Sequence, residues 1–343
     1  MDRVNCFIFD LYERLKKLHA RYTEKKVIIT GYKGSSSIYS FKARRIRTGL
    51  EKSREQLAGV LPVLARMIVK IGLEWDFEIH FFSGETTVSV LTDVHRKKHQ
   101  VNINTTGIRN RGVFHSLAHE FCHARMTEAI HPFFGTVKLD LGTGNDHRRY
   151  EEHYTMIMNG ILDIWVEDMI AEIFPQMTDD GVKKSVDVVL NAVNTFRETR
   201  SYKNGLEIHA LALRQQAFKR GLSLATLIHV QLLLSSTLVS HIRRSKKEFK
   251  LMEEDWFDYW LYVKWLVALT NVERGKKITV AQIKACTELL TDLPHLDPIK
   301  RARAMRMYTS TVQKICSLLD YPQLTISYKS TRNTPVLARK GIS

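Results

Sequence analysis

The chain has few cysteines and no two of them in a C-x-x-C arrangement. Its 343 residues contain four, which are widely separated: Cys6, Cys122, Cys286 and Cys316. This spacing argues against a disulfide framework and against a cysteine-based zinc site, and it is typical of reduced thiols inside a cell. The opening residues also lack the apolar run of a signal peptide, because charged residues interrupt it early. We therefore expect a cytoplasmic protein.

A long uninterrupted apolar run is also missing. The most apolar stretch, residues 222–242, carries several polar side chains, among them His229 and Gln231. It therefore predicts a buried helix and no membrane partner. The Gly/Ser-rich stretch 31–40 lacks the Lys-Ser/Thr pair of a phosphate-binding loop, so we expect an ordinary loop there and no nucleotide site.

Acidic residues are too few to balance the basic ones. The chain has 52 Lys and Arg against 36 Asp and Glu, a net charge of +16. Such an excess suggests contact with nucleic acid, another anionic assembly or an acidic substrate, although general solubility would also explain it. No module that combines aromatic and basic residues for nucleic-acid binding is visible. The hydrophobic fraction of 44% is enough for a substantial core.

What the sequence does contain is an H-E-x-x-H motif. His119, Glu120 and His123 lie within the stretch 113–127, which has apolar residues at helical spacing and no Gly or Pro. Two histidines four residues apart project from one face of a helix, so both can bind one metal ion. The glutamate between them can take a proton from a water molecule activated by that ion. Cys122 is expected to point away as a packed thiol.

The pattern before this helix predicts a small antiparallel sheet. A short strand is expected at residues 27–30, and three more β-rich runs look like a meander that leads into the H-E-x-x-H helix: residues 77–82, 86–92 and 100–105. A small sheet that feeds an active-site helix is the plan of a zincin-like fold. The following stretch, residues 133–149, is expected to be a loop that walls the cleft.

The rest of the chain has helical periodicity. We expect a strong helix over residues 150–174 and then helices over 182–199, 205–220, 222–243, 254–270, 279–292 and 295–319. The fold class is thus α+β and mostly helical. We predict three parts: a zincin-like metallopeptidase domain (1–178), a helical C-terminal domain (179–328) and a basic flexible tail (329–343).

A catalytic zinc ion needs a third protein ligand. Two acids of the second helix, Asp163 and Glu167, are four residues apart, and Asp168 follows directly. Apolar residues surround these acids, and burying a carboxylate among them is costly unless a cation compensates. Glu167 is the acid we favour, with Asp163 and Asp168 as alternatives that would otherwise orient a ligand imidazole.

Other candidates precede these acids. Asp146 lies one residue out of register with the Gly-Thr-x-Asp signature that it resembles, that of aspzincins. His147 and His153 are further alternatives for the third ligand. Tyr150 and Tyr154 could stabilise a transition-state oxyanion, and nothing in the sequence selects between them.

Two segments resemble a known family. Residues 119–127 resemble the H-E-x-x-H-x-R-x-T opening of zincin-like domains linked to cobaltochelatase-type von Willebrand A proteins, and residues 167–172 resemble the E-D-x-R-x-E segment of that group. The resemblance covers about residues 75–175. It departs at Ile170, where Arg is expected, and no D-x-S-x-S motif is present. It implies a gluzincin-like role for Glu167 and a structural role for Glu172.

These observations predict a zinc-dependent metallopeptidase. His119, His123 and Glu167 would hold Zn²⁺, Glu120 would act as general base, and the substrate would be a peptide or protein. The alternative is a non-catalytic zincin-fold protein that binds a nucleoprotein or other anionic assembly through its basic surface. A metal-dependent hydrolase of nucleic acid fits less well, because such sites favour several carboxylates.

Overall fold

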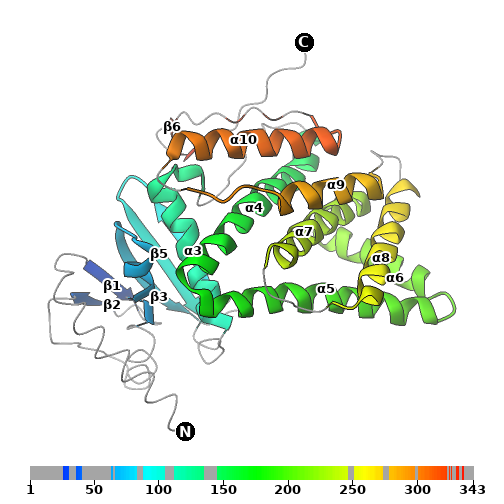
Figure 1. The fold of residues 1–343 in the computed structure, drawn as a ribbon, viewed down its shortest axis with the longest axis horizontal. Coiled ribbons are helices and arrows are strands. Elements are labelled where there is room, and N and C mark those ends of the chain that lie inside the picture. Colours follow the sequence, from blue (N-terminus) through cyan, green and yellow to red (C-terminus); the bar gives the residue numbers. More distant parts are fainter. Residues whose placement is uncertain are drawn as a thin grey trace, which may run out of the picture. The chain divides into compact units, whose positions relative to one another are not determined.

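A computed structural model of the chain describes residues 26–30, 36–40, 63–64, 66–82, 88–104, 112–134, 145–245, 251–272, 278–297, 300–322, 324, 326, 330–331 and 334–335. The chain divides into two compact units, Met1–Thr136 (unit 1) and Val137–Ser343 (unit 2). Unit 1 holds a β-sheet and helix α3, and unit 2 holds helices α4 to α10 (Figure 1).

The sheet of unit 1 has five strands in the order β2-β1-β3-β5-β4. Neighbours pair in both directions: β1 and β3 are parallel, β3 and β5 are parallel, and the two outer strands β2 and β4 are antiparallel to their neighbours. The strands are β1 (Lys26–Thr30), β2 (Ser36–Ser40), β3 (Asp76–Phe82), β4 (Val88–Asp93) and β5 (Lys98–Asn104).

The predicted antiparallel meander is wrong, because the sheet is mixed. Phe77 of β3 pairs directly with His99 of β5 in parallel register, and β4 lies outside β5 at the edge of the sheet. The expected loop at residues 31–40 is also wrong in its second half, which forms β2. Alternating apolar residues identify a strand, but they do not identify its neighbour.

Helix α3 (Gly112–Ala129) carries the H-E-x-x-H motif, and its presence confirms the predicted helix. One face of α3 is fully buried and includes Leu117, Phe121, Cys122 and Met126. The ring edge of Phe121 packs on Phe77 of β3, with 5.8 Å between the ring centroids. Cys122 is thus a packed thiol, as expected. A short 3-10 helix, η1 (Pro132–Phe134), follows in the stretch that was expected to be loop.

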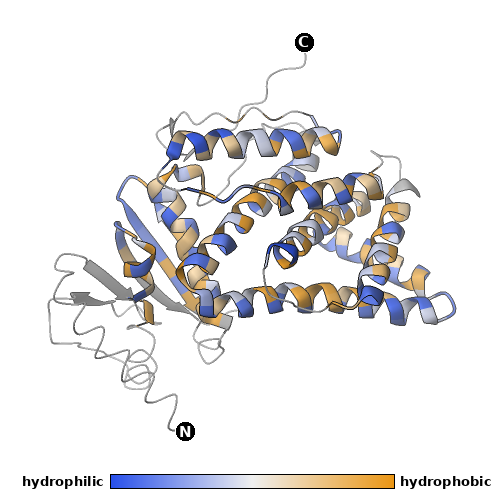
Figure 2. Ribbon diagram, in the orientation of Figure 1, coloured by the Kyte–Doolittle hydropathy of each residue, from blue (hydrophilic) through white to orange (hydrophobic). Residues whose placement is uncertain are grey.

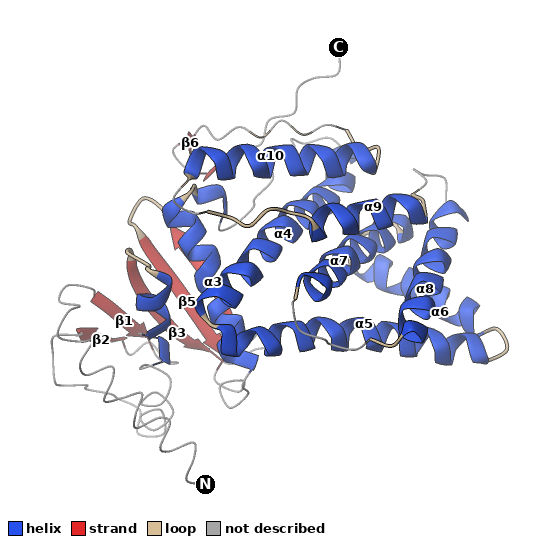
Figure 3. Cartoon of the chain, in the orientation of Figure 1, coloured by secondary structure: helices blue, strands red, loops and turns tan. Residues whose placement is uncertain are grey.

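Unit 2 is built from helices, which confirms the helical periodicity (Figure 3). They are α4 (Asn145–Ile173), α5 (Thr178–Ser201), α6 (Gly205–Lys219), α7 (Leu224–Arg244), α8 (Glu253–Val272), α9 (Val280–Thr291) and α10 (Arg301–Leu318), with a 3-10 turn η2 (Pro175–Met177) after α4. Helix α4 begins five residues earlier than the predicted helix, and residues 295–297 and 300 lie outside α10.

Helix α7 is the central helix of unit 2. It packs against α4, α5, α6, α8 and α9. By length and composition this helix could cross a membrane, but 72% of its most apolar window is buried inside the protein. A core helix is buried in this way, and the polar residues within the apolar stretch predicted a buried helix.

Local signals explain where the helices begin. The chain turns at Gly221 with a φ of +67°, which suits glycine, and the Ser223 hydroxyl then accepts a hydrogen bond from the Thr226 N–H at 3.1 Å. At the start of α9, Thr279 and Gln282 form a reciprocal capping box. Helix α7 thus begins two residues after its predicted start, and α9 one residue after its predicted start.

The two compact units differ from the predicted domains. A boundary at residue 178 would separate α4 from α5, whereas unit 2 begins at Val137 and includes both. Most of the predicted tail from Lys329 lies outside the described residues. Within it, β6 (Ser330–Thr331) pairs antiparallel with β7 (Thr334–Pro335).

An ion pair joins three helices of unit 2. The Arg244 guanidinium of α7 binds both carboxylate oxygens of Asp168 of α4, through Nε at 3.2 Å and through Nη2. Its Nη1 also donates to the backbone carbonyls of Thr291 (2.7 Å) and Leu293 (2.6 Å), at the end of α9. Both charged side chains are nearly buried, so each depends on the other for its charge to be tolerated.

We therefore expect Asp168→Asn to lower the free energy of unfolding by about 2–3 kcal/mol, because the Arg244 charge would remain buried without a carboxylate. Urea denaturation of the full chain measures this change. Asp187→Asn on the exposed face of α5 is the matched control, expected to change stability by less than about 0.5 kcal/mol. Equal effects of the two variants would contradict the role given to this pair.

Candidate metal centre

The two motif histidines lie side by side on α3. His119 and His123 are both half-buried, their ring centroids are 4.9 Å apart, and their Nε2 atoms are separated by 3.3 Å. Helical geometry explains this, because residues four apart lie on the same face one turn from each other. Both rings therefore present the same nitrogen to one point in space.

This spacing can be compared with a zinc site. Two nitrogens bound to one tetrahedral zinc ion at about 2.0–2.1 Å are about 3.3–3.4 Å from each other. The observed 3.3 Å between the Nε2 atoms matches that value. A hydrogen bond between two neutral imidazoles would give a similar distance, so the spacing fits zinc without requiring it. Glu120 follows His119 directly and is also half-buried.

A third histidine on the same helix was not predicted. His115 lies one turn before His119, is 6% exposed, and has its ring centroid 6.4 Å from that of His119. Its signal was present in the sequence, since positions 115, 119 and 123 repeat the four-residue spacing. A buried imidazole beside a ligand histidine can position that ligand or donate a proton.

Two other residues of the motif resemblance have polar partners on or beside α3. The Thr127 hydroxyl donates to the backbone carbonyl of His123 at 3.1 Å. Arg125 lies near two carboxylates, with its Nη1 4.0 Å from Glu74 and 3.9 Å from Glu128. The Arg and Thr of the H-E-x-x-H-x-R-x-T pattern thus have structural partners in unit 1.

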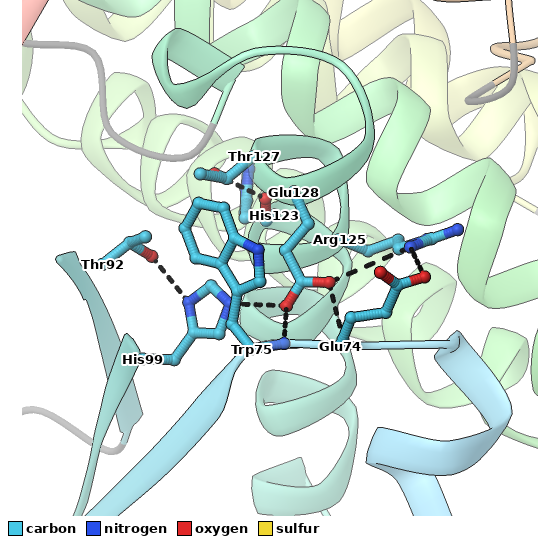
Figure 4. Close-up of polar contacts among 8 residues, drawn as sticks. All are labelled: Glu74, Trp75, Thr92, His99, His123, Arg125, Thr127 and Glu128. Atoms are coloured by element: carbon cyan, nitrogen blue, oxygen red, sulfur yellow. Dashed lines mark hydrogen bonds and ion pairs between the residues drawn. The ribbon is translucent and has the colours of Figure 1, made fainter. Parts of the chain in front are cut away.

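The end of α3 is fixed to the sheet by Glu128 (Figure 4). Its carboxylate accepts hydrogen bonds from the backbone N–H groups of Glu74 (2.7 Å) and Trp75 (2.9 Å), which precede β3, and from Nε2 of His99 in β5 (2.9 Å). The side chain of Glu128 is only 3% exposed and that of His99 is fully buried. This contact network determines where the motif helix lies on the sheet.

His99 is oriented by its other neighbours. Its Nδ1 lies 2.9 Å from the Thr92 hydroxyl of β4, and its ring stacks on Trp75 with 5.3 Å between centroids. Because an ionised carboxylate can only accept, His99 Nε2 is the donor in its hydrogen bond to Glu128. Sequence reasoning missed this network, because its members are far apart along the chain and follow no motif.

The hydrogen bonds to Glu128 change its acidity. Burial raises the pKa of this carboxyl, but the hydrogen bonds from His99 and from the backbone amides of Trp75 and Glu74 outweigh that effect. The net result is a pKa below the ordinary value of 4.5. Glu128 therefore stays ionised in the folded protein at neutral pH and stabilises it in that form.

The predicted third ligand and its neighbour both face positive or protonatable groups of unit 2. Glu167 Oε2 lies 3.6 Å from Nε2 of His241 in α7, and His241 Nδ1 lies 3.0 Å from the Ser185 hydroxyl. Asp168 binds Arg244 and lies 3.0 Å from His295. These contacts explain how two largely buried carboxylates are tolerated even if no metal ion is bound. The role of Glu167 as a metal ligand stays a prediction.

The remaining candidates lie elsewhere on α4. Asp163, half-buried, is one helical turn before Glu167. Asp146 and His147 are in the first turn of α4, where the side chains lie outside the described residues. His153 is 3% exposed and stacks on Tyr321, with 5.2 Å between ring centroids.

The two tyrosines differ in their surroundings. Tyr154 is buried and donates its hydroxyl to the Pro322 carbonyl at 2.7 Å, which favours a structural role. Tyr150 is half-buried and packs against Tyr154 and Tyr321. Neither contact assigns an oxyanion-stabilising role to these hydroxyls.

Comparison with known proteins identifies no relative: no family model, no curated protein and no solved structure matches the chain. The resemblance to zincin-like domains therefore stays a prediction, and function has to be argued from the residues and their geometry.

The Glu128 network leads to a prediction about stability and pH. Glu128→Gln should lower the free energy of unfolding at pH 7 by about 2–3 kcal/mol, because hydrogen bonds to a buried charge become weaker neutral ones. Since the folded pKa is lowered, the stabilisation is present above the unfolded-state pKa and is lost as pH falls through the folded-state pKa. Denaturant titrations between pH 7 and pH 3 should show stability converging for the two proteins.

Glu74→Gln serves as the control for this variant, because the Glu74 side chain is 78% exposed and its nearest cation is 4.0 Å away. A change below about 0.5 kcal/mol is expected for it. A Glu128→Gln protein whose stability ran parallel to that of the unmodified protein down to pH 3 would contradict the assigned ionisation.

Proposed function

We propose that the chain is a zinc metallopeptidase whose site is centred on His119, Glu120 and His123. The observation that supports this most directly is the 3.3 Å separation of the two Nε2 atoms on one half-buried helix face. That separation matches the distance between two nitrogens bound to one tetrahedral zinc ion, and the intervening glutamate is the general base that the proposed chemistry needs.

The third ligand in this proposal is an acid of α4. Glu167 faces His241 and Asp168 binds Arg244, so the negative charges of these two acids are compensated without a metal ion. Asp163, which the sequence left open, is the acid we now favour as the third donor, because a carboxylate beside two histidines suits a zinc ion. Glu167 remains the alternative named from the sequence.

The chemistry would be divided between the ion and the chain. A zinc ion held by these side chains would acidify a water molecule and polarise the carbonyl of the scissile peptide bond. The Glu120 carboxylate would take the proton from that water and later donate it to the amine that leaves. His119 and His123 would bind the ion through Nε2 lone pairs, so these two nitrogens carry no proton in the metal-bound form.

A place for the peptide is suggested by strand β4. It is an outer strand of the sheet, antiparallel to β5, and α3 packs against it. Leu91 of β4 is 54% exposed. An extended peptide can pair with the free edge of such a strand through main-chain hydrogen bonds. This arrangement would bring a substrate backbone beside the helix that carries Glu120.

A substitution at Glu120 tests the mechanism. Glu120→Gln should reduce cleavage of a peptide library by at least about 100-fold, because general base catalysis contributes roughly 10²–10⁴. Zinc content should be unchanged, since Glu120 is not a ligand in this proposal. Mass-spectrometric digestion profiles and elemental analysis of the same preparation measure both quantities.

The control is Glu207→Gln, which changes an exposed carboxylate of α6 in the same way and should leave cleavage unaffected. Full cleavage by Glu120→Gln would discard this mechanism. Stoichiometric zinc in a protein that cleaves no peptide would instead favour the alternative, a non-catalytic zincin-fold interaction protein.

A pair of substitutions on α4 identifies the third ligand. Asp163→Asn should weaken zinc binding by more than about 100-fold, because loss of a direct ligand exceeds the roughly 10–100-fold typical of supporting residues. Glu167→Gln, one turn away, should retain zinc within about 10-fold. Competition with a chelator of known affinity measures both. The opposite ranking would restore Glu167 as the ligand.

A further inference from the structure

Helix α10 presents a basic face to solvent. Its inner face is buried and includes Tyr308, Val312 and Ile315. From Arg303 onward its exposed positions recur at helical spacing and carry only charged, hydroxyl and amide side chains: Arg303, Arg306, Ser310, Gln313, Lys314 and Ser317. Figure 2 shows the resulting mixture of hydrophilic and hydrophobic segments along α10. None of the residues of this helix is acidic. We call these six side chains the basic face.

The charge of the chain is concentrated in this region of the sequence. Residues 298–343 contain nine Lys and Arg and one acid, Asp320, so their net charge is +8. That is half of the net charge of +16 of the whole chain. An even distribution would place only about two positive charges in these 46 residues. A general bias toward basic residues therefore does not explain the excess.

These cations do not serve the stability of unit 2. Arg303, Arg306 and Lys314 have no ion-pair partner within the part of the chain that the structure describes. The first turn of α10 contains no acid, and its N-cap Lys300 makes no side-chain cap. Arg303 lies in this first turn, where a positive charge opposes the helix dipole at a cost of roughly 0.3–1 kcal/mol. A cation that opposes local stability in this way indicates another role.

The chemistry of the basic face fits the phosphodiester backbone of a nucleic acid. Arginine, lysine, serine and glutamine are the side chains that commonly contact phosphate oxygens. Arg303 and Lys314 are eleven residues apart, about 16 Å along the helix, which corresponds to several successive phosphates of one strand. No aromatic side chain lies on the basic face, so base stacking would not contribute. A bilayer surface fits less well, because this face exposes no large apolar side chain.

We infer that the basic face of α10 binds the backbone of duplex nucleic acid without sequence preference. The contacts are electrostatic, so affinity should fall steeply with salt concentration as counterions are released. This inference does not depend on the proposed peptidase activity. It names a surface for the anionic partner that the composition suggested.

The test compares the full chain with Arg303→Gln/Arg306→Gln/Lys314→Gln in titrations with a fluorescent mixed-sequence DNA duplex. Each lost phosphate contact should reduce the magnitude of the slope of log K against log salt by about 0.9. The slope of the triple variant should therefore be smaller in magnitude by about 2–3. Binding near 0.1 M salt should weaken by about 100-fold. Circular dichroism verifies that the variant, altered only at exposed positions, remains folded.

The control removes the same number of exposed charges elsewhere in unit 2, with Lys203→Gln/Arg214→Gln/Lys219→Gln, and should bind within about 3-fold of the unmodified chain. Equal losses in both triple variants would show that net charge alone attracts the duplex and would overturn the inference. So would failure of the unmodified chain to bind the duplex at about 0.1 M salt, or preferential binding of phosphatidylserine vesicles over it.

Discussion

The carboxylate of Glu128 is the contact on which the position of the motif helix depends. Glu128 lies in the last turn of α3, where the helix dipole disfavours a negative charge, and it is almost fully buried. Both costs are offset by donors from outside the helix, namely His99 and the amides before β3. The same bonds that keep this charge in place hold α3, which carries the histidine pair, against the sheet.

Local pattern predicted the helices and the histidine pair, because both depend on residues a few positions apart. The 3.6-residue period predicted α3 to α10 with ends up to six residues from those observed, and the spacing of His119 and His123 placed both imidazoles on one face. The order of the strands was not predictable in this way. The alternation of apolar residues along a strand does not depend on whether its neighbour is parallel or antiparallel. The pairing of β3 with β5 therefore became evident only from the structure.

The acids of α4 show why the third ligand was harder to predict. Glu167 and Asp168 lie among apolar residues, and a metal ion was one cation that could compensate them. The structure supplies others from α7, where Arg244 follows Asp168 by 76 residues and His241 faces Glu167. A sequence alone does not reveal which distant cation meets a given acid. The choice among Asp163, Glu167 and Asp168 as the third ligand therefore stays a proposal.

The basic face of α10 and the histidine pair differ in how much their proposed function depends on each single residue. A metal site requires particular atoms at particular distances, so one substitution removes it. A phosphate-binding face sums several weak contacts of similar size, so its strength depends on the number of cations more than on the position of any one. Arg303 and Arg306 are therefore replaceable individually. The histidines on α3 are not, and this difference allows the two proposed functions to be tested separately.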